Sequence, residues 1–241
     1  MITYSPHPAR RSTRLAWVLC SGRVRVALIG SFGIMPPGAS RDPPEIVIRY
    51  PAGANVANPI HTPRLLMRHF RLDDWRDLHQ MQGDPVATVF IGGPWSSDKS
   101  REVTGLIVAA YPSNPWEWWA VADNQTDRVM GACWLGPLRQ KWCNALGWGQ
   151  EIELGYRYAK EYWGNGYATE AAHAMLRRGF GELGLRRIVG IVDVGNAASE
   201  RVLKKLGMSP AGAGTHEGVT IRGYRLDAAE LGKSPAVGRA G

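Results

Sequence analysis

The sequence of 241 residues predicts one mixed α/β domain over residues 59–228. Apolar residues make up 44% of the chain and charged residues 21%, a balance typical of a globular protein with a sizeable core. Segments with helical spacing of apolar residues alternate with segments in which every second residue is apolar. Their order is β-α-α-β-β-β-α-β-α-β, without an internal repeat.

The first half of this domain is expected to hold three strands and two helices. Residues 62–70 (TPRLLMRHF) have the apolar positions of a strand. Asp73 and Ser97 are the expected N-caps of the next two helices, because their side chains can accept hydrogen bonds from free amides at a helix start. Residues 118–122 and 129–135 form a hairpin around the turn DNQTDR. The side chains expected to be buried on the helices are Trp75, Leu78, Met81, Val103, Leu106, Ile107 and Ala110.

The second half is expected to hold three strands and two helices. Trp142 and Trp148 lie in a segment (QKWCNALGWGQ) expected to be a loop that forms part of an acceptor-site wall. A helix over residues 168–183 should end at Gly184, and Asn196 should cap a helix that ends at Gly207. The expected strands are residues 151–158, 187–194 and 219–226.

Residues 1–58 and 229–241 are expected to lie outside the domain, as a poorly ordered arm and a flexible tail. The net charge of +8 is concentrated in the arm, where seven Arg and two acidic residues give +5. Residues 59–211 carry eighteen basic and sixteen acidic residues, so the domain is nearly neutral. This distribution argues against nucleic acid as the main ligand and leaves open that the basic arm contacts a partner.

Three widely spaced cysteines, Cys20, Cys133 and Cys143, indicate a reducing compartment rather than a disulfide framework, and they lack the spacing of a zinc site. The apolar run over residues 15–20 is too short for an export signal or a membrane span. We therefore expect a cytoplasmic protein that uses no metal and has no membrane contact.

The segment YWGNGYATEA places Gly164 and Gly166 between a strand and a helix. A glycine-rich turn before a helix presents free amides and a positive dipole end to one point, so it predicts a phosphate or pyrophosphate site. A P-loop would need a Lys-Ser or Lys-Thr pair after the glycines, and a dinucleotide fold would need a parallel βαβ unit around them. Neither is found, and a plain tight turn stays an alternative.

The segment WGNGYA also resembles the acyl-CoA loop of the GCN5-related N-acetyltransferases, with the pattern Arg/Gln-x-x-Gly-x-Gly/Ala. Gly166 and Ala168 match this pattern, whereas Trp163 stands where Arg or Gln is usual. Further similarities lie in TPRLLMRHFRLDDW, GDPVATVFIGGP and NAASERVLKKLGM, the last of which resembles an N-x-x-S-x-x-V/L-x-x-K-L-G-F element. Together they cover residues 61–226 and resemble the branch that contains the ribosomal-protein alanine N-acetyltransferases.

This resemblance implies a mixed, mostly antiparallel sheet whose central strands splay apart and are flanked by helices. It implies acetyl-CoA as co-substrate, with the pantetheine between the strands over residues 151–158 and 187–194. Backbone amides would hold the pyrophosphate, the Thr169 hydroxyl would add a contact, Asn196 would bond the pantetheine, and Ser199 would also lie at the cofactor. The residues whose amides would hold the pyrophosphate are Gly164, Asn165, Gly166, Tyr167 and Ala168.

The reaction implied is direct attack of a neutral amine on the acetyl group, which needs a base, an oxyanion site and a proton donor for the thiolate. Glu153 is the first choice for the base, and Glu151 lies on the same side of the strand. Glu217, next to His216, is the other candidate. By resemblance, Ser199 would be the donor, and amides around Leu154 and Tyr156 would serve the oxyanion.

The acceptor is left open between a protein N-terminus, an aminoglycoside or other small amine, and an amino acid, because fold and cofactor site do not fix it. A nearly neutral domain gives no special support to an aminoglycoside, for which a strongly acidic cleft is expected. A non-catalytic module that binds CoA is the alternative from another functional class. A homodimer is also left open.

Overall fold

The computed structural model describes residues 14–20, 23–29, 58–111 and 118–231. The chain divides into two compact units, residues 1–49 and 50–241. In the first unit, β1 (Arg14–Cys20) and β2 (Arg23–Ile29) form an antiparallel hairpin, which the sequence did not predict. The rest of the predicted arm lies outside the described residues, as do residues 232–241 of the predicted tail.

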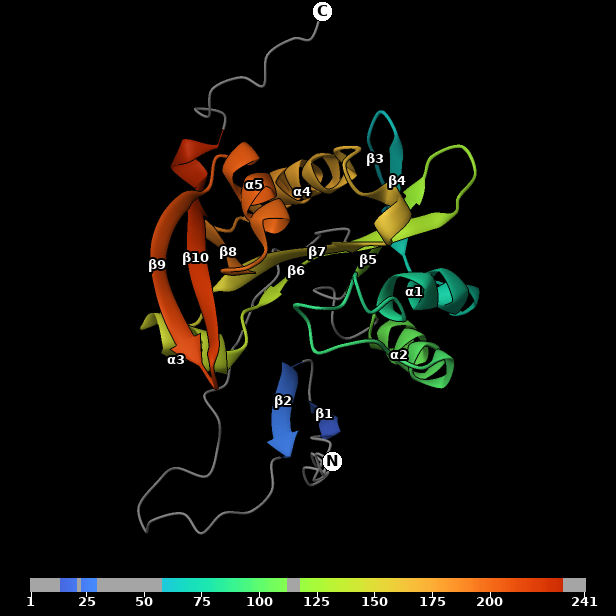
Figure 1. Cartoon of the computed structure of the whole chain (residues 1–241), viewed down its shortest axis with the longest axis horizontal. Coiled ribbons are helices and arrows are strands. Elements are labelled where there is room, and N and C mark those ends of the chain that lie inside the picture. The colour runs from blue at the N-terminus through green and yellow to red at the C-terminus, as the bar shows by residue number, and fades with distance from the viewer. Residues whose placement is uncertain (1–13, 21–22, 30–57, 112–117, 232–241) are drawn as a thin grey trace, which may run out of the picture. The chain divides into compact units, whose positions relative to one another are not determined.

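The second unit is built on an eight-stranded sheet in the order β3-β4-β5-β6-β7-β8-β10-β9 (Figure 1). Every neighbouring pair is antiparallel except β7 and β8, which are parallel. The strands are β3 (Ile60–His61), β4 (Leu65–His69), β5 (Trp119–Asp123), β6 (Val129–Pro137), β7 (Ile152–Tyr158), β8 (Arg187–Asp193), β9 (Ser209–His216) and β10 (Val219–Asp227).

Helices cover both faces of this sheet, α4 and α5 on one side and α1, α2 and α3 on the other (Figure 1). Apolar side chains of α1 and α4 face inward, as the burial of Leu78 and Met81 on α1 and of Met175 and Leu176 on α4 shows. The helices are α1 (Trp75–Gln82), α2 (Ser97–Ala110), α3 (Gln140–Leu146), α4 (Tyr167–Arg177) and α5 (Ala197–Lys205).

The predicted fold class is confirmed, and the structure corrects several local predictions. The cap of α2 is Ser96, whose side chain accepts a hydrogen bond from the amide of Lys99, and Ser97 is already helical. A 3-10 helix precedes α1, so Asp73 lies inside that helix and Asp74 is the cap residue of α1. Leu106 is 56% exposed, because it lies on the outer side of α2.

Besides the β1–β2 hairpin, one helix and two strands were not predicted. The segment expected as a loop contains α3, and β3 and β9 extend the two edges of the sheet. The helix expected over residues 168–183 is α-helical only as far as Arg177 and continues as a π-helix over Arg178–Glu182. Gly184, at φ 63°, follows as the expected stop.

Within the described residues, none of the helices is long and apolar enough to cross a membrane.

Candidate active site

The central strands β7 and β8 meet at only one position, where Glu153 pairs with Val189. In the ladder between β6 and β7, Leu138 donates to the Glu151 carbonyl and Ala159 donates to the Met130 carbonyl. Odd-numbered residues of β7 therefore bond to β6, and even-numbered residues direct their amides and carbonyls toward β8. Beyond the bridge at Glu153, no further pairing of β7 with β8 is found in the described part of the chain.

The parting of β7 from β8 leaves backbone groups on the facing edges. Leu154 adjoins the bridge, and Tyr156 is the first residue beyond it whose N–H faces the gap. An extended chain lying there could bond to these edges as a short extra strand does. The sequence expectation of splayed central strands is confirmed, and their facing edges carry backbone groups to which a linear ligand with amide groups could bond.

The glycine turn lies directly after the end of β7. Gly164 and Gly166 have φ values of 80° and 79°, which only glycine adopts at little cost. The first hydrogen bond of α4 runs from the amide of Glu170 to the carbonyl of Gly166, so the amides of Tyr167, Ala168 and Thr169 have no acceptor within the helix. A Cβ at Gly164 would have no atom within 4 Å, so the turn is open to a ligand. These features fit a pyrophosphate.

An arginine from the start of the domain holds this turn in place. Arg64 donates through Nε to Glu170 Oε2 at 2.7 Å and through an Nη1 atom to the carbonyl of Asn165 at 2.9 Å. The Thr62 hydroxyl donates to the other Glu170 oxygen at 2.6 Å. Burial opposes the charge of Glu170, but the bonds from Thr62 and Arg64 outweigh it and lower the pKa of Glu170. The guanidinium also lies 4.6 Å from the ring centroid of Tyr167.

Trp163, the departure from the acyl-CoA loop pattern, has a structural role. Its indole Nε1 donates to the carbonyl of Tyr158 at 2.9 Å, and the Tyr158 hydroxyl donates to the carbonyl of Tyr167 at 3.2 Å. The loop is thus tied to the end of β7 and to the start of α4. The positive charge beside the turn comes from Arg64, whose Nη2 would lie 3.6 Å from a Cβ at Gly166.

Ser199 and Asn196 lie at the start of α5, across the gap from β7. The Asn196 side chain accepts a hydrogen bond from the Ser199 amide at 3.0 Å, so its predicted cap role is confirmed. The Tyr156 hydroxyl lies 2.9 Å from Ser199 Oγ and donates to the Ser199 carbonyl at 3.0 Å. Burial raises the pKa of Tyr156, so this phenol carries its proton at neutral pH.

Glu153 lies on the opposite face of β7 from Tyr156, because side chains alternate along a strand. It is half-buried, and burial raises its pKa to about 7 against the attraction of Arg139 and Arg157. A carboxylate that titrates near neutral pH can take a proton and release it again. Glu151, on the same side, lies 3.8 Å from Arg187 and is tied into an ion pair.

Within the described structure, no contact joins Glu217 to Glu153. Glu217 lies in the turn between β9 and β10 with φ 48°, and its side chain is 79% exposed. Its neighbour His216 meets the ring of Trp142 edge-on at 5.8 Å between centroids. Glu217 therefore has the surroundings of a solvated turn residue.

The face of β7 that carries Glu153 is bordered by aromatic side chains. Trp134 lies over Gly155, where a Cβ would overlap its ring, and Trp118 stacks on Trp134 at 4.8 Å. On the side of α3, Trp142 and Trp148 are half-buried and pack against a cluster of Leu138, Cys143 and Val189. The two tryptophans expected in an acceptor-site wall thus also close a small core.

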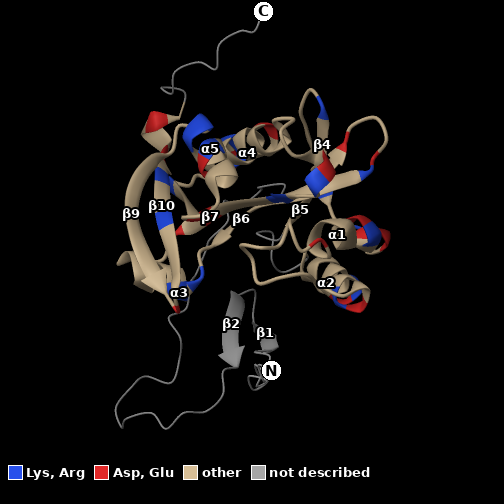
Figure 2. Cartoon of the chain, viewed as in Figure 1, with Lys and Arg blue, Asp and Glu red and all other residues tan. Residues whose placement is uncertain are grey.

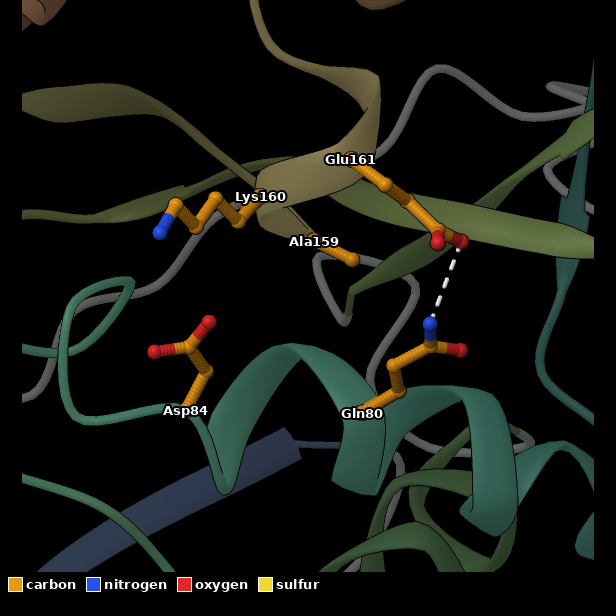
Figure 3. Close-up of a pocket in the computed structure, with 5 residues that line it drawn as sticks. All are labelled: Gln80, Asp84, Ala159, Lys160 and Glu161. Atoms are coloured by element: carbon orange, nitrogen blue, oxygen red, sulfur yellow. Dashed lines mark hydrogen bonds between the residues drawn. The ribbon is translucent and has the colours of Figure 1, made fainter.

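A hollow of about 410 Å³ lies just beyond the C-terminal end of β7, beside the end of α1 (Figure 3). Its lining residues are Gln80, Asp84, Ala159, Lys160 and Glu161. Gln80 donates to Glu161 at 3.1 Å, and the Lys160 ammonium and Asp84 carboxylate lie on the other side of the hollow. None of the predicted site residues lines it.

Sequence reasoning missed three side chains of this region, Arg64, Arg157 and the hydroxyl of Tyr156. The alternation of EIELGYRY could have placed Arg157 beside Glu153 and Tyr156 on the other face. No local signal connects Arg64 with Glu170, because 106 residues separate them. In the described residues no group of three or more His, Cys, Asp or Glu side chains could hold a metal ion.

Comparison with known proteins identifies a family whose model matches this chain. The model of the acetyltransferase (GNAT) domain matches residues 64–209, more than half of the chain. The protein YkkB of Bacillus subtilis (strain 168) is 38% identical over 90 residues, which cover 37% of this chain and 49% of YkkB. The chain thus spans about half the length of that relative. The uncharacterized N-acetyltransferase p20 of Bacillus licheniformis is 28% identical over 155 residues, 64% of this chain and 83% of p20.

Solved structures show the same fold. The crystal structure of a GNAT-family acetyltransferase from Bacillus anthracis matches with a TM-score of 0.60 at 24% identity, over 72% of this chain and all of that one. Ribosomal-protein-S5-alanine acetyltransferase from Vibrio fischeri matches with a TM-score of 0.55 at 15% identity, over 71% of this chain and 97% of its own. At these identities the likeness concerns the fold alone.

Proposed function

Because the chain belongs to the acetyltransferase (GNAT) domain family, we propose that it transfers the acetyl group of acetyl-CoA to a primary amine within a ternary complex. The observation that carries this proposal is the gap between β7 and β8, which opens beside the glycine turn of α4. A linear ligand with amide groups and a pyrophosphate fits both features at once. Acetyl-CoA supplies an activated acyl group as a thioester.

The amides at the start of α4 would hold the pyrophosphate, with Gly164 and Gly166 leaving room for it. Asn165 and Thr169 would add polar groups at the same point. Arg64 keeps the turn in position through Glu170 and adds positive charge beside it. Asn196 would bond the pantetheine at the start of α5. In this arrangement the chain positions the thioester and forms no covalent bond with it.

In the transfer, a bond forms between the acceptor nitrogen and the acetyl carbon, and the thioester C–S bond breaks. Glu153 takes the proton of the acceptor ammonium, which frees the lone pair of the nitrogen. The amide of Tyr156 would face the carbonyl oxygen on which negative charge develops. Glu153 is preferred over Glu217 because it is half-buried with a pKa of about 7, whereas Glu217 is exposed.

The sulfur leaves as a thiolate and needs a proton. Ser199 would donate it from its hydroxyl and would be reprotonated by Tyr156, whose oxygen lies 2.9 Å away, and solvent would return a proton to Tyr156. The high pKa of Tyr156 keeps that phenol protonated between turnovers. We further propose that the reaction needs no metal and takes place in the cytoplasm. The acceptor would be a protein N-terminus or a small amine.

The test has two stages, binding and turnover. Calorimetry should show acetyl-CoA binding to the wild-type chain, and Gly166→Val should abolish it, because a β-branched residue at φ 79° strains the turn. Gly105→Ala, in α2 with no atom within 4 Å of the added carbon, is the control that should bind normally. Thiol release from acetyl-CoA is then measured with a panel of amines and peptides.

Each outcome decides a different point. Normal binding of acetyl-CoA by Gly166→Val would overturn the assignment of the glycine turn as the pyrophosphate site. Binding without thiol release across the whole panel would favour the non-catalytic CoA-binding module. Thiol release that requires an added amine would support the transferase.

A further inference from the structure

Arg157 is a half-buried cation on the same face of β7 as Glu153. Its guanidinium carbon lies 4.9 Å from the ring centroid of Trp118 and 5.5 Å from that of Trp134. The two rings stack on each other at 4.8 Å, and Trp95 continues the stack at 6.5 Å from Trp118. We call Trp95, Trp118 and Trp134 the tryptophan shelf. It holds the Arg157 side chain in one orientation beside β7.

No carboxylate lies within salt-bridge distance of Arg157 in the described part of the chain, and its side chain donates no hydrogen bond there. Other half-buried or buried arginines of the domain are paired, as Arg68 is with Asp74 at 2.7 Å and with Asp127 at 2.7 Å. A half-buried charge that has no partner within the described protein can pair with an anionic group that arrives from outside.

Arg139 adds a second cation to this face. It precedes α3 and is exposed, and it makes no ion pair with a described residue. Burial and repulsion from Arg139 together lower the pKa of Arg157 to about 10, against the attraction of Glu153. Lys141 lies next along α3, over the ring of Trp142 at 4.6 Å. Ribbon segments coloured blue for Lys and Arg lie beside α3 in Figure 2.

A protonated Glu153 carries no charge and does not neutralise these cations. Because its pKa is about 7, half of the molecules carry this proton at pH 7. The face that surrounds the proposed base is therefore positively charged. An acceptor with only a cationic amine would be repelled there. An acceptor that also carries a negative group would pair with Arg157 while its nitrogen lies near Glu153.

We propose that the acceptor is an amine that also bears a carboxylate, and that Arg157, assisted by Arg139, binds this carboxylate on the tryptophan shelf. This inference rests on the proposed acetyl transfer and names the class of its acceptor. The carboxylate can come from a free amino acid or from an acidic side chain next to a peptide N-terminus. Both present the same chemistry to a guanidinium, and the experiment separates them.

The experiment measures kcat/KM for two matched pairs of acceptors, L-alanine with L-alaninamide, and Ala-Asp-Ala-amide with Ala-Asn-Ala-amide. For each acceptor the value for Arg157→Gln is divided by the wild-type value, which removes differences in amine basicity. We expect a loss of about 10-fold or more for the carboxylate member of one pair and little loss for its amide partner. Arg157→Lys should lose less, because it keeps the charge but not the planar fork.

Arg101→Gln is the matched control, because Arg101 also lies over a tryptophan, 4.4 Å from the ring of Trp75 on α1. Calorimetry with N-acetyl-L-alanine, N-acetyl-L-alaninamide and the corresponding N-acetylated peptides gives a readout without turnover. The wild-type chain should bind the acid form more tightly, and Arg157→Gln should remove the difference.

Equal effects of Arg157→Gln on both members of both pairs would overturn the inference while leaving the acetyl transfer intact. The same loss in Arg101→Gln would overturn it as well. If no amine is acetylated by the wild-type chain, the proposed function fails, and equal binding of the acid and amide products would then overturn the carboxylate site.

Discussion

The pKa of Glu153 gives the sharpest prediction about the reaction. A base must be ionised to take a proton, and the pKa of Glu153 is raised from 4.5 to about 7 by burial. About one-tenth of the molecules would be ionised at pH 6 and about nine-tenths at pH 8. We therefore expect kcat/KM to rise about 10-fold between these pH values. Glu153→Gln should remove this rise of kcat/KM with pH, which we call the pH limb, and lower kcat/KM by roughly 100-fold or more.

The same shift predicts an effect on stability. The folded chain holds the proton of Glu153 more tightly than the unfolded chain does, so the shift has no effect below pH 4.5. As the pH rises from 4.5 through 7, the unfolded state ionises first, and the free energy of unfolding falls by up to about 3 kcal/mol, at about 1.4 kcal/mol per pKa unit. Glu153→Gln should abolish that fall, as urea unfolding at pH 5 and pH 8 can measure.

Two variants test whether this reasoning is sound. Glu102→Gln, on the exposed side of α2 and paired only with Lys99, should keep both the pH limb and the wild-type stability profile. The pH dependence of kcat/KM that comes from ionisation of the acceptor amine is the same in all variants, and it is corrected for before the variants are compared. If Glu217→Gln lost the limb while Glu153→Gln kept it, the assignment of the base would be refuted.

Three further predictions concern the surroundings of β7. Arg64→Ala removes the cation that holds Glu170, so the Kd for acetyl-CoA should rise about 10-fold by calorimetry, and an unchanged Kd would contradict the clamp. Tyr156→Phe keeps the ring but removes the hydroxyl at Ser199, so kcat should fall about 10-fold to 100-fold at an unchanged KM for acetyl-CoA. If kcat of Tyr156→Phe equalled that of the wild type, the phenol would have no part in proton donation. Gly155→Ala places a methyl group against Trp134 and should lower the free energy of unfolding by about 1–3 kcal/mol in urea. Gly149→Ala, with open space around it, gives the baseline, and equal stability of the two variants would contradict this packing.

The sequence predicted those elements whose signal is local. The hairpin of β5 and β6 has two apolar strands around a polar turn, and α4 and α5 have helical stripes that end near a glycine. Asn196 was identified as a cap because its type and position suffice for that role. The glycine turn belongs to the same class, since two glycines ahead of a helix allow the positive φ values that this turn adopts.

Two of the elements that were missed in the second unit, β9 and α3, have weak local signals. The segment of β9 (SPAGAGTH) has little strand propensity, and it becomes a strand because it pairs along most of its length with β10. Its small residues allow α3 to approach closely, since a Cβ at Gly214 would overlap the backbone of Ala145. The helix α3 is short and lacks a side-chain cap, so local rules favoured a loop.

Trp163 shows how the two kinds of information combine. The resemblance located the acyl-CoA turn from Gly166 and Ala168 but found no cation at the first position of the pattern. The structure places Arg64 at the turn from 101 residues away, bonded to the carbonyl of Asn165. A tryptophan at 163 can then close the turn onto β7 through its indole N–H, because the positive charge is supplied by Arg64 from the turn between β3 and β4. The substitution is therefore compatible with binding of a pyrophosphate, provided that Arg64 and Glu170 stay paired.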